Sequence, residues 1–84
     1  PAATLAIVNP RSGAGATGRR WGRAFARLRD VLGPLEVELT RGPRDAVRIA
    51  REAARAGVER LVVAGGDGTT SEVVTGLLGA GLGE

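Results

Sequence analysis

The chain has 84 residues, the size of one small domain, and its twelve basic and nine acidic residues give a formal net charge of +3. It has no His, Cys, Met or Tyr, and every basic residue is Arg. This composition excludes Ser-His-Asp and Cys-His triads, Cys/His zinc sites, disulfides, Schiff-base lysines and the lysine of a Walker P-loop.

The first predicted strand is the apolar run from Leu5 to Val8, which Asn9-Pro10 ends. A short continuous apolar run is typical of a strand buried on both faces. After a glycine-rich loop, in which Thr17 is the expected helix cap, apolar residues return at helical spacing until Gly33-Pro34. They predict an amphipathic helix whose core-facing stripe holds Trp21, Ala24, Phe25, Leu28, Val31 and Leu32.

The second unit begins with residues 35–39, where apolar residues alternate with Glu, the pattern of a strand with one face in water. A helix is predicted from about Pro43, with Gly57 as its C-cap. Arg48 and Glu52 have the spacing of an ordinary i,i+4 ion pair on its surface. The apolar side of this helix is expected to hold Ala46, Val47, Ala50, Ala53 and Ala54.

The third unit begins with the apolar strand from Leu61 to Ala64 and continues through Gly65-Gly66-Asp67-Gly68-Thr69 into a helix. Thr69 and Glu72 have the spacing of a capping box, which predicts that the helix begins there. Its apolar face is expected to hold Val73, Val74, Leu77 and Leu78.

Three strand-helix units in series predict an α/β fold with a parallel sheet, right-handed crossovers and helices on both faces. The half-polar second strand suits an edge, which favours the strand order 2-1-3. In that order the topological switch point lies between the first and third strands, and ligands of open α/β sheets bind there, outside the carboxyl ends of the strands. The loops at this point are residues 9–18 and 65–70, the two glycine-rich segments.

The glycines around Asp67 allow backbone amides to approach a polyphosphate, and the dipole of the following helix adds positive potential. Asp67 would then reach a phosphate-bound Mg²⁺ or an attacking hydroxyl. The plain alternative is a flexible turn with Thr69 as the helix cap. Thr40, which ends the second strand at the same edge, could hydrogen-bond a nucleotide or simply end a strand.

Residues 9–15 offer a side-chain amide, a hydroxyl and mobile backbone amides beside the same cleft, although they could also be an ordinary connection. Gly13 to Gly18 also spells the dinucleotide fingerprint G-x-G-x-x-G. A Rossmann site places its first glycine directly after the strand and an acidic residue at the end of the second strand. Here residues 9–12 intervene and the second strand ends on Thr40, so the fingerprint reading is disfavoured.

Three motifs together resemble the N-terminal part of the diacylglycerol kinase catalytic domain: Asn-Pro-Arg-Ser-Gly at 9–13, Thr40, and Gly-Gly-Asp-Gly-Thr-Thr-Ser-Glu-Val at 65–73. This family includes bacterial diacylglycerol and YegS-like lipid kinases, sphingosine kinases and ceramide kinases. The glycine-aspartate motif alone is shared with NAD kinases and is similar to one in phosphofructokinases. The upstream Asn-Pro-x-Ser-Gly favours the lipid kinases.

The resemblance implies a kinase that uses ATP and Mg²⁺ and transfers the γ-phosphoryl group to a lipid hydroxyl such as that of diacylglycerol. Asp67 matches the aspartate that the family needs for activity, whether through Mg²⁺ or through the acceptor hydroxyl. The sequence assigns no metal ligands. The implied nucleotide-binding residues are Asn9, Pro10, Arg11, Ser12, Gly13, Thr40, Gly65, Gly66, Asp67, Gly68, Thr69, Thr70, Ser71 and Glu72.

The sequence departs from the family pattern in two ways. Ser71 stands where the family usually has Asn, which changes the contact detail at that point. The family's chain also continues through more strands and a second, β-rich domain that holds the lipid acceptor, whereas this sequence stops at Glu84. We therefore expect residues 1–84 to be the N-terminal nucleotide-binding portion of a longer kinase, inactive in lipid phosphorylation by itself.

Expectations about partners follow from composition and fold. The arginines are dispersed and accompany one Trp and one Phe, so we expect no nucleic-acid partner. The absence of Cys, of a signal-peptide pattern and of an apolar run near ~20 residues favours a cytoplasmic location, with peripheral membrane contact of the longer protein. An unpaired edge on the third strand would favour self-association.

Two other functions remain open at this point. One is an NAD kinase-like or NAD(P)-binding domain, which Gly13 to Gly18 and the glycine-aspartate motif suggest. The other is a non-enzymatic module that binds anions or nucleic acid through the arginines.

Overall fold

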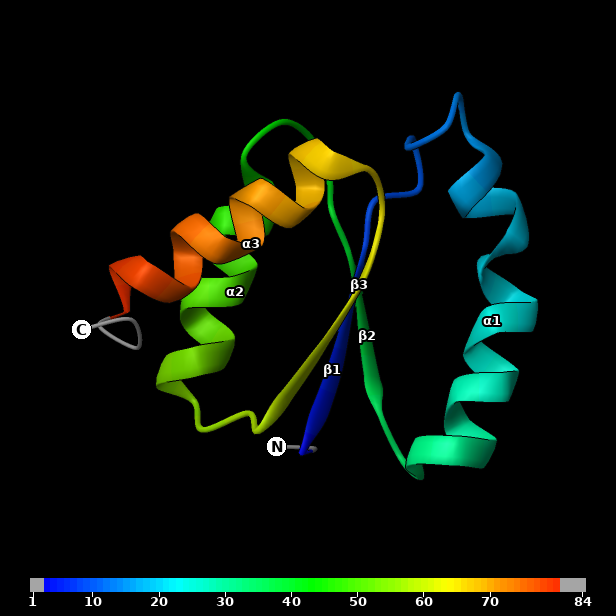
Figure 1. The fold of residues 1–84 in the computed structure, drawn as a ribbon, viewed down its shortest axis with the longest axis horizontal. Helices are drawn as coiled ribbons and strands as arrows, with labels where there is room; N and C mark the ends of the chain where they lie inside the picture. The colour runs from blue at the N-terminus through cyan, green and yellow to red at the C-terminus, as the bar shows by residue number, and fades with distance from the viewer. Residues whose placement is uncertain (1–2, 81–84) are drawn as a thin grey trace.

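The computed structural model describes residues 3–80 as three strands that alternate with three helices (Figure 1). The elements are β1 (Thr4–Val8), α1 (Ala16–Leu32), β2 (Glu36–Leu39), α2 (Asp45–Arg55), β3 (Arg60–Ala64) and α3 (Asp67–Gly79). This alternation confirms the predicted α/β class. None of these helices is long and apolar enough to cross a membrane.

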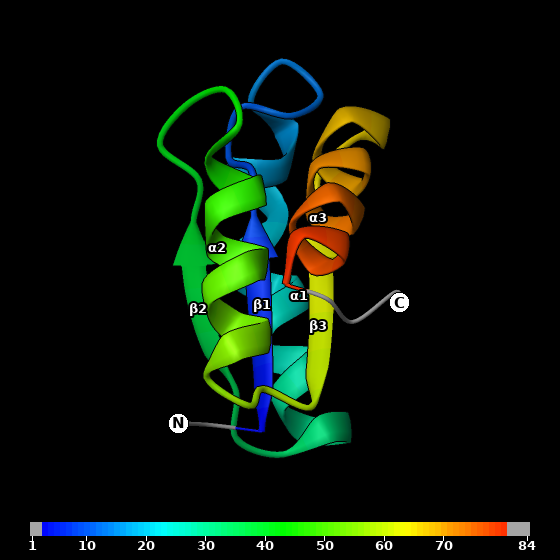
Figure 2. The ribbon, with the colours of Figure 1, turned by 90° about the vertical axis from the view of Figure 1, so that its left-hand side faces the viewer.

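The sheet is parallel and has the order β2-β1-β3, as predicted from the half-polar second strand. The central strand β1 is buried along its whole length, whereas every residue of β2 is exposed. Leu5 of β1 pairs with Glu36 on one side and Leu61 on the other. Helices cover both faces: α2 and α3 lie side by side over one, and α1 lies over the other (Figure 2).

The core lies between β1 and the two helices α2 and α3. Ile7 of β1 and Ile49 of α2 are among the largest fully buried side chains, although the predicted apolar side of α2 did not include Ile49. Gly76 of α3 lets the two helices approach closely, because a Cβ at this position would clash with the carbonyl oxygen of Val47. The other buried members of the core are Leu5, Ala46, Ala50, Ala53 and Val73.

The prediction that α1 contributes a core stripe is wrong. None of its residues is buried, Trp21 is only half-buried, and Val31 is 80% exposed. Trp21 instead pairs with Phe25 at a ring-centroid distance of 5.9 Å. Ala24 and Val31 of the predicted stripe are exposed, and the rest of it is only partly covered. Within residues 3–80, α1 is the only helix over its face of the sheet, so no neighbouring helix closes over the stripe (Figure 2).

A similar correction applies to α3. Val73 is buried and Leu77 packs partly against the core, as expected, but Val74 and Leu78 are 50% and 53% exposed. The face turned toward α2 passes instead through Thr69 and Gly76, which are both buried. Two non-apolar residues therefore occupy positions on the packed face that the apolar pattern could not indicate.

The helix starts also differ from the predictions. Helix α1 begins at Ala16 after Gly15 in the left-handed conformation, so Thr17 is not its cap. Helix α2 begins at Asp45 rather than near Pro43. Helix α3 begins at Asp67, so Thr69 lies inside it and forms no capping box with Glu72.

The helix ends agree better with the predictions. Gly33 caps α1. Gly57 has a positive φ just after α2, where Val58 N–H bonds to the carbonyl of Ala53.

Candidate functional site

Three loops meet at the carboxyl ends of the three parallel strands. They follow β1 at Asn9, β2 at Thr40 and β3 at Gly65. Backbone hydrogen bonds fix the start of two of them: Asn9 N–H donates to the carbonyl of Ala64, and Thr40 N–H donates to the carbonyl of Val8, each at 2.8 Å. The strand order therefore brings together the segments that the sequence singled out.

Asn9 links the first loop to α3. Its side-chain Nδ2 donates a 3.1 Å hydrogen bond to Oγ1 of Thr69, and its Oδ1 accepts a 3.0 Å bond from the N–H of Arg11. Thr69 is only 5% exposed, so the accepting end of this bond is buried. The hydroxyl of Thr69 therefore joins the first loop to α3.

A cavity of about 180 Å³ opens between the loops after β1 and β2 and the first turns of α2 and α3. Residues predicted for the site contribute most of its wall: Asn9, Arg11, Thr40, Thr69 and Glu72. The prediction missed Gly42, Pro43 and Ala46, which also line it. The switch point between the first and third strands does not point to them; the signal that could have found them is their position directly after Thr40, at the carboxyl end of the second strand.

The N-terminus of α3 lies beside this cavity. Its N-cap is Gly66, which has extended backbone and no side-chain cap, and its first helical hydrogen bond runs from Thr70 N–H to the carbonyl of Gly66. The amides of residues 67–69 precede that bond and have no acceptor within the helix. Such an end attracts anions through its free amides and its dipole. Asp67, in the first turn, is exposed and able to reach a ligand at this point.

Open space surrounds this helix start. A Cβ on Gly66 would lie 3.5 Å from Oγ of Ser12, an ordinary contact, and one on Gly68 would meet no atom within 4 Å. Gly65 differs, because its Cβ would lie 2.6 Å from Oγ1 of Thr69. Gly65 is therefore required by packing inside the protein, whereas Gly66 and Gly68 leave room outside it.

The structure places the other predicted residues around the cavity rather than in it. Gly13 and Gly65 line a separate hollow beside Trp21 on the α1 side, and Pro10 lines a hollow beside β2. The hydroxyl of Thr70 donates to the carbonyl of Gly66 at 3.4 Å. Ser71 is exposed on α3.

The glycines of the G-x-G-x-x-G pattern have local backbone reasons. Gly13 and Gly15 have φ values of +62° and +91°, a region that favours glycine. A Cβ on Gly18 would lie 2.8 Å from the carbonyl oxygen of Pro10. Turn geometry and close packing therefore account for a pattern that would otherwise indicate a dinucleotide site.

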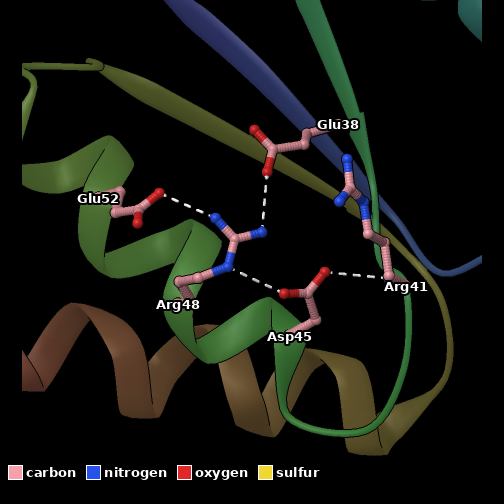
Figure 3. Close-up of polar contacts among 5 residues, drawn as sticks. All are labelled: Glu38, Arg41, Asp45, Arg48 and Glu52. Carbon is pink, nitrogen blue, oxygen red and sulfur yellow. Dashed lines mark hydrogen bonds and ion pairs between the residues drawn. The ribbon is translucent and has the colours of Figure 1, made fainter.

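An ionic network lies next to the site, between β2 and the start of α2 (Figure 3). Asp45 accepts a bond from Arg48 Nε and another from the backbone N–H of Arg41, each at 3.0 Å. The bond from Arg48, followed by that from Arg41, holds the pKa of the Asp45 carboxyl below its usual value. Arg48 also reaches Glu52 at 3.0 Å, the i,i+4 pair predicted from sequence, and Glu38 at 3.4 Å.

Comparison with known proteins identifies the family. Residues 3–83 match the family described as the diacylglycerol kinase catalytic domain. The chain belongs to this family. The match agrees with the resemblance seen in the motifs at residues 9–13 and 65–73.

Two relatives of this chain are described as probable lipid kinases. A "Probable lipid kinase YegS-like" of Chromohalobacter salexigens is 46% identical over 55 residues, which are 66% of this chain and 18% of that protein. A protein of the same description from Serratia proteamaculans is 40% identical over 77 residues, 92% of this chain and 24% of that protein. The chain therefore spans about a quarter or less of the length of these relatives.

A solved structure has the same fold. It is described as "A putative diacylglycerol kinase from Bacillus anthracis str. Sterne" and superposes with a TM-score of 0.77 at 32% identity, covering 87% of this chain and 26% of that one. The fold that brings the three loops together is therefore also the fold of a solved structure.

Membership in a kinase family implies the use of ATP, and the residues present suit a metal-nucleotide. Within residues 3–80 no group of three or more Asp or Glu side chains could hold a metal ion. Mg²⁺ in phosphoryl-transfer sites is commonly held by one or two carboxylates together with the phosphates of the substrate. Asp67, a single exposed carboxylate at the N-terminus of α3, fits that requirement.

Proposed function

We propose that residues 1–84 are the nucleotide-binding portion of a lipid kinase, whose full-length form transfers the γ-phosphoryl group of ATP to a lipid hydroxyl such as that of diacylglycerol. The observation that carries this proposal is the hydrogen bond between Asn9 and Thr69, which joins the two family motifs at one edge of the sheet. The named relatives are lipid kinases, which supports the choice of acceptor class.

The site has the chemistry that phosphoryl transfer requires. Such a reaction depends on positioning and charge neutralisation rather than on a covalent intermediate. The free amides at the start of α3 and the dipole of that helix would hold the phosphates. Asn9 and Thr40 would contact the nucleotide from the neighbouring loops, and Asp67 would hold Mg²⁺ or orient the acceptor hydroxyl. Mg²⁺ would supply neutralisation of the phosphate charge.

The acceptor lipid is proposed to bind to a part of the kinase beyond these 84 residues, so the isolated chain should bind nucleotide without phosphorylating lipid. In this proposal the full-length protein works in the cytoplasm at a membrane surface, where ATP and a lipid substrate meet. Self-association through the outer edge of β3 stays a hypothesis that the strand order supports.

Ligand-dependent stability tests the proposal directly. Thermal unfolding of the full-length protein should be measured with Mg-ATP, NAD, NADP and inorganic phosphate at equal concentrations. We expect Mg-ATP to raise the melting temperature most, since a ligand at 100 times its Kd adds about 2.7 kcal/mol to the free energy of unfolding. Greater stabilisation by NADP would overturn the proposal. Phosphorylation of diacylglycerol by the 84-residue chain alone would overturn the claim that the chain is inactive.

A further inference from the structure

The two peptide groups that flank Thr40 each donate a hydrogen bond. Its own N–H donates to the carbonyl of Val8 at 2.8 Å, which ties it to the central strand. The next peptide N–H, that of Arg41, donates to Oδ2 of Asp45 at 3.0 Å (Figure 3). The two peptide units that flank Thr40 are therefore both fixed, one by the sheet and one by a side chain of α2.

The Asp45 carboxylate is itself held in place. Its second oxygen, Oδ1, accepts a 3.0 Å bond from Arg48 Nε, and its side chain is only 17% exposed. The guanidinium of Arg48 continues to Glu52 on α2 and to Glu38 on β2 (Figure 3). The network thus connects the Asp45 carboxylate, through Arg48, to both α2 and the edge strand β2.

The turn that this carboxylate closes has an unfavourable backbone conformation. Arg44, which directly precedes α2, has a φ of +68°, in the left-handed region that disfavours residues other than glycine. Such a residue costs on the order of 1 kcal/mol or more and persists only where its surroundings fix it. The same turn places Gly42 and Pro43 in the wall of the cavity that Thr40 lines. The bonds to Asp45 therefore stabilise a turn that forms part of the candidate site.

We propose that Asp45 is a positioning residue for nucleotide binding: it fixes the peptide after Thr40, and with it the wall formed by Gly42 and Pro43, while Arg48 holds Asp45 in place. This inference rests on the proposed function, because it assumes that the cavity receives the nucleotide. Asp45 itself touches the turn rather than the cavity, so it acts through Thr40.

Steady-state kinetics of the full-length kinase test this inference. Asp45→Ala should raise the KM for ATP about five- to tenfold, which is less than the direct loss of a hydrogen bond to a charged group would cost, because Asp45 acts through the turn and not on the nucleotide. The kcat and the KM for lipid should stay within about twofold of wild type, because the reacting atoms are not touched. Asp45→Asn keeps an oxygen that can accept the Arg41 bond, so it should restore most of the ATP affinity. Glu52→Gln is the matched control, since it removes a partner of Arg48 without touching the turn, and it should leave the KM for ATP unchanged.

A double-variant cycle separates positioning from a general structural role. Thr40→Ala should raise the KM for ATP, and Asp45→Ala should add less than its full effect in the same chain, because part of its effect passes through Thr40. If Asp45→Ala left the KM for ATP unchanged, or multiplied the effect of Thr40→Ala, the inference would fail while ATP binding stood. An equal effect of Glu52→Gln would also overturn it. If Thr40→Ala left the KM for ATP unchanged, both the inference and the assignment of Thr40 to the nucleotide site would fail. A different result, no rise in the melting temperature of the wild-type protein with Mg-ATP, would reject the proposed function itself.

Discussion

The side-chain amide of Asn9 and the hydroxyl of Thr69 form a 3.1 Å hydrogen bond between residues that are 60 positions apart in the chain. The bond joins the loop after the central strand to the first turns of α3. Because Asn9 also accepts a bond from Arg11 N–H, its amide sets the course of the first loop as well. Nucleotide affinity and fold stability should therefore both depend on this pair.

Removing the Thr69 hydroxyl should affect both properties. Thr69→Val keeps the side-chain shape but loses the oxygen that accepts from Asn9, so we expect a loss of about 1 kcal/mol in the free energy of unfolding and weaker Mg-ATP binding. Thr69→Ser keeps the oxygen and is the control. Urea unfolding and calorimetric titration with Mg-ATP measure the two effects. Equal behaviour of the Val and Ser variants would show that the bond contributes little.

Gly65 and Gly66 should respond to substitution in opposite ways. A Cβ on Gly65 would lie 2.6 Å from Oγ1 of Thr69, so Gly65→Ala should lower the melting temperature. Gly66 has extended backbone and an ordinary contact with Ser12, so Gly66→Val should fold with a small loss of stability but bind Mg-ATP much more weakly. Unchanged ATP affinity in Gly66→Val would indicate that this loop is only a turn.

The contact between α2 and α3 predicts a contrast between two helical glycines. Gly76→Ala would place a methyl group against the backbone of Val47, and we expect a destabilisation of about 1 to 3 kcal/mol. Gly22 lies on exposed α1, where a Cβ would meet nothing within 4 Å, so Gly22→Ala should stabilise by up to about 1 kcal/mol through helix propensity. Chemical denaturation of both variants checks the opposite signs. A stabilising Gly76→Ala would refute the close approach of the helices.

Asp67 should be needed for turnover and dispensable for folding. Its exposed position at the start of α3 suggests that Asp67→Asn changes the melting temperature little. In the full-length kinase the same substitution should abolish phosphorylation of diacylglycerol, because it removes the carboxylate proposed to hold Mg²⁺ or the acceptor hydroxyl. A radiolabelled phosphate-transfer assay measures this. Activity near the wild-type level would remove Asp67 from the catalytic machinery.

The pH dependence of stability should reveal the Asp45 network. The pKa of this carboxyl is lower in the folded protein than its usual value of about 3.9. The stabilisation is therefore complete above that usual value and is lost as the pH falls through the lower, folded pKa. Glu38 and Glu52 also contact Arg48, so the comparison with Asp45→Asn isolates the Asp45 contribution. We expect the difference in urea midpoint between the two chains to be constant from about pH 7 to 5.5 and to shrink below about pH 4. A difference that grew on acidification would contradict the network.

The sequence predicted the sheet better than the helix surfaces. The half-polar second strand led to the observed strand order. The apolar runs did not predict burial as well, because all of β2 is exposed and β3 is only partly buried. Periodicity in α1 shows a face without showing what packs on it, and Trp21 is therefore less buried than predicted. Thr69 could not be placed because its partner, Asn9, lies far away in the chain. The bond from the Arg41 backbone N–H to the Asp45 carboxylate was missed because it depends on how the turn before α2 folds back.

The central position of β1 determines when the candidate site can form. This strand is the first in the chain, yet Leu5 needs Glu36 and then Leu61 before both of its edges are paired. The second pairing, between β1 and β3, joins residues that are far apart in the chain. Its cost in loop-closure entropy is therefore large, and we expect it to form late in folding. Asn9 can bond to Thr69 only after Thr69 has been synthesised, so we expect the first loop to reach its native position late in folding.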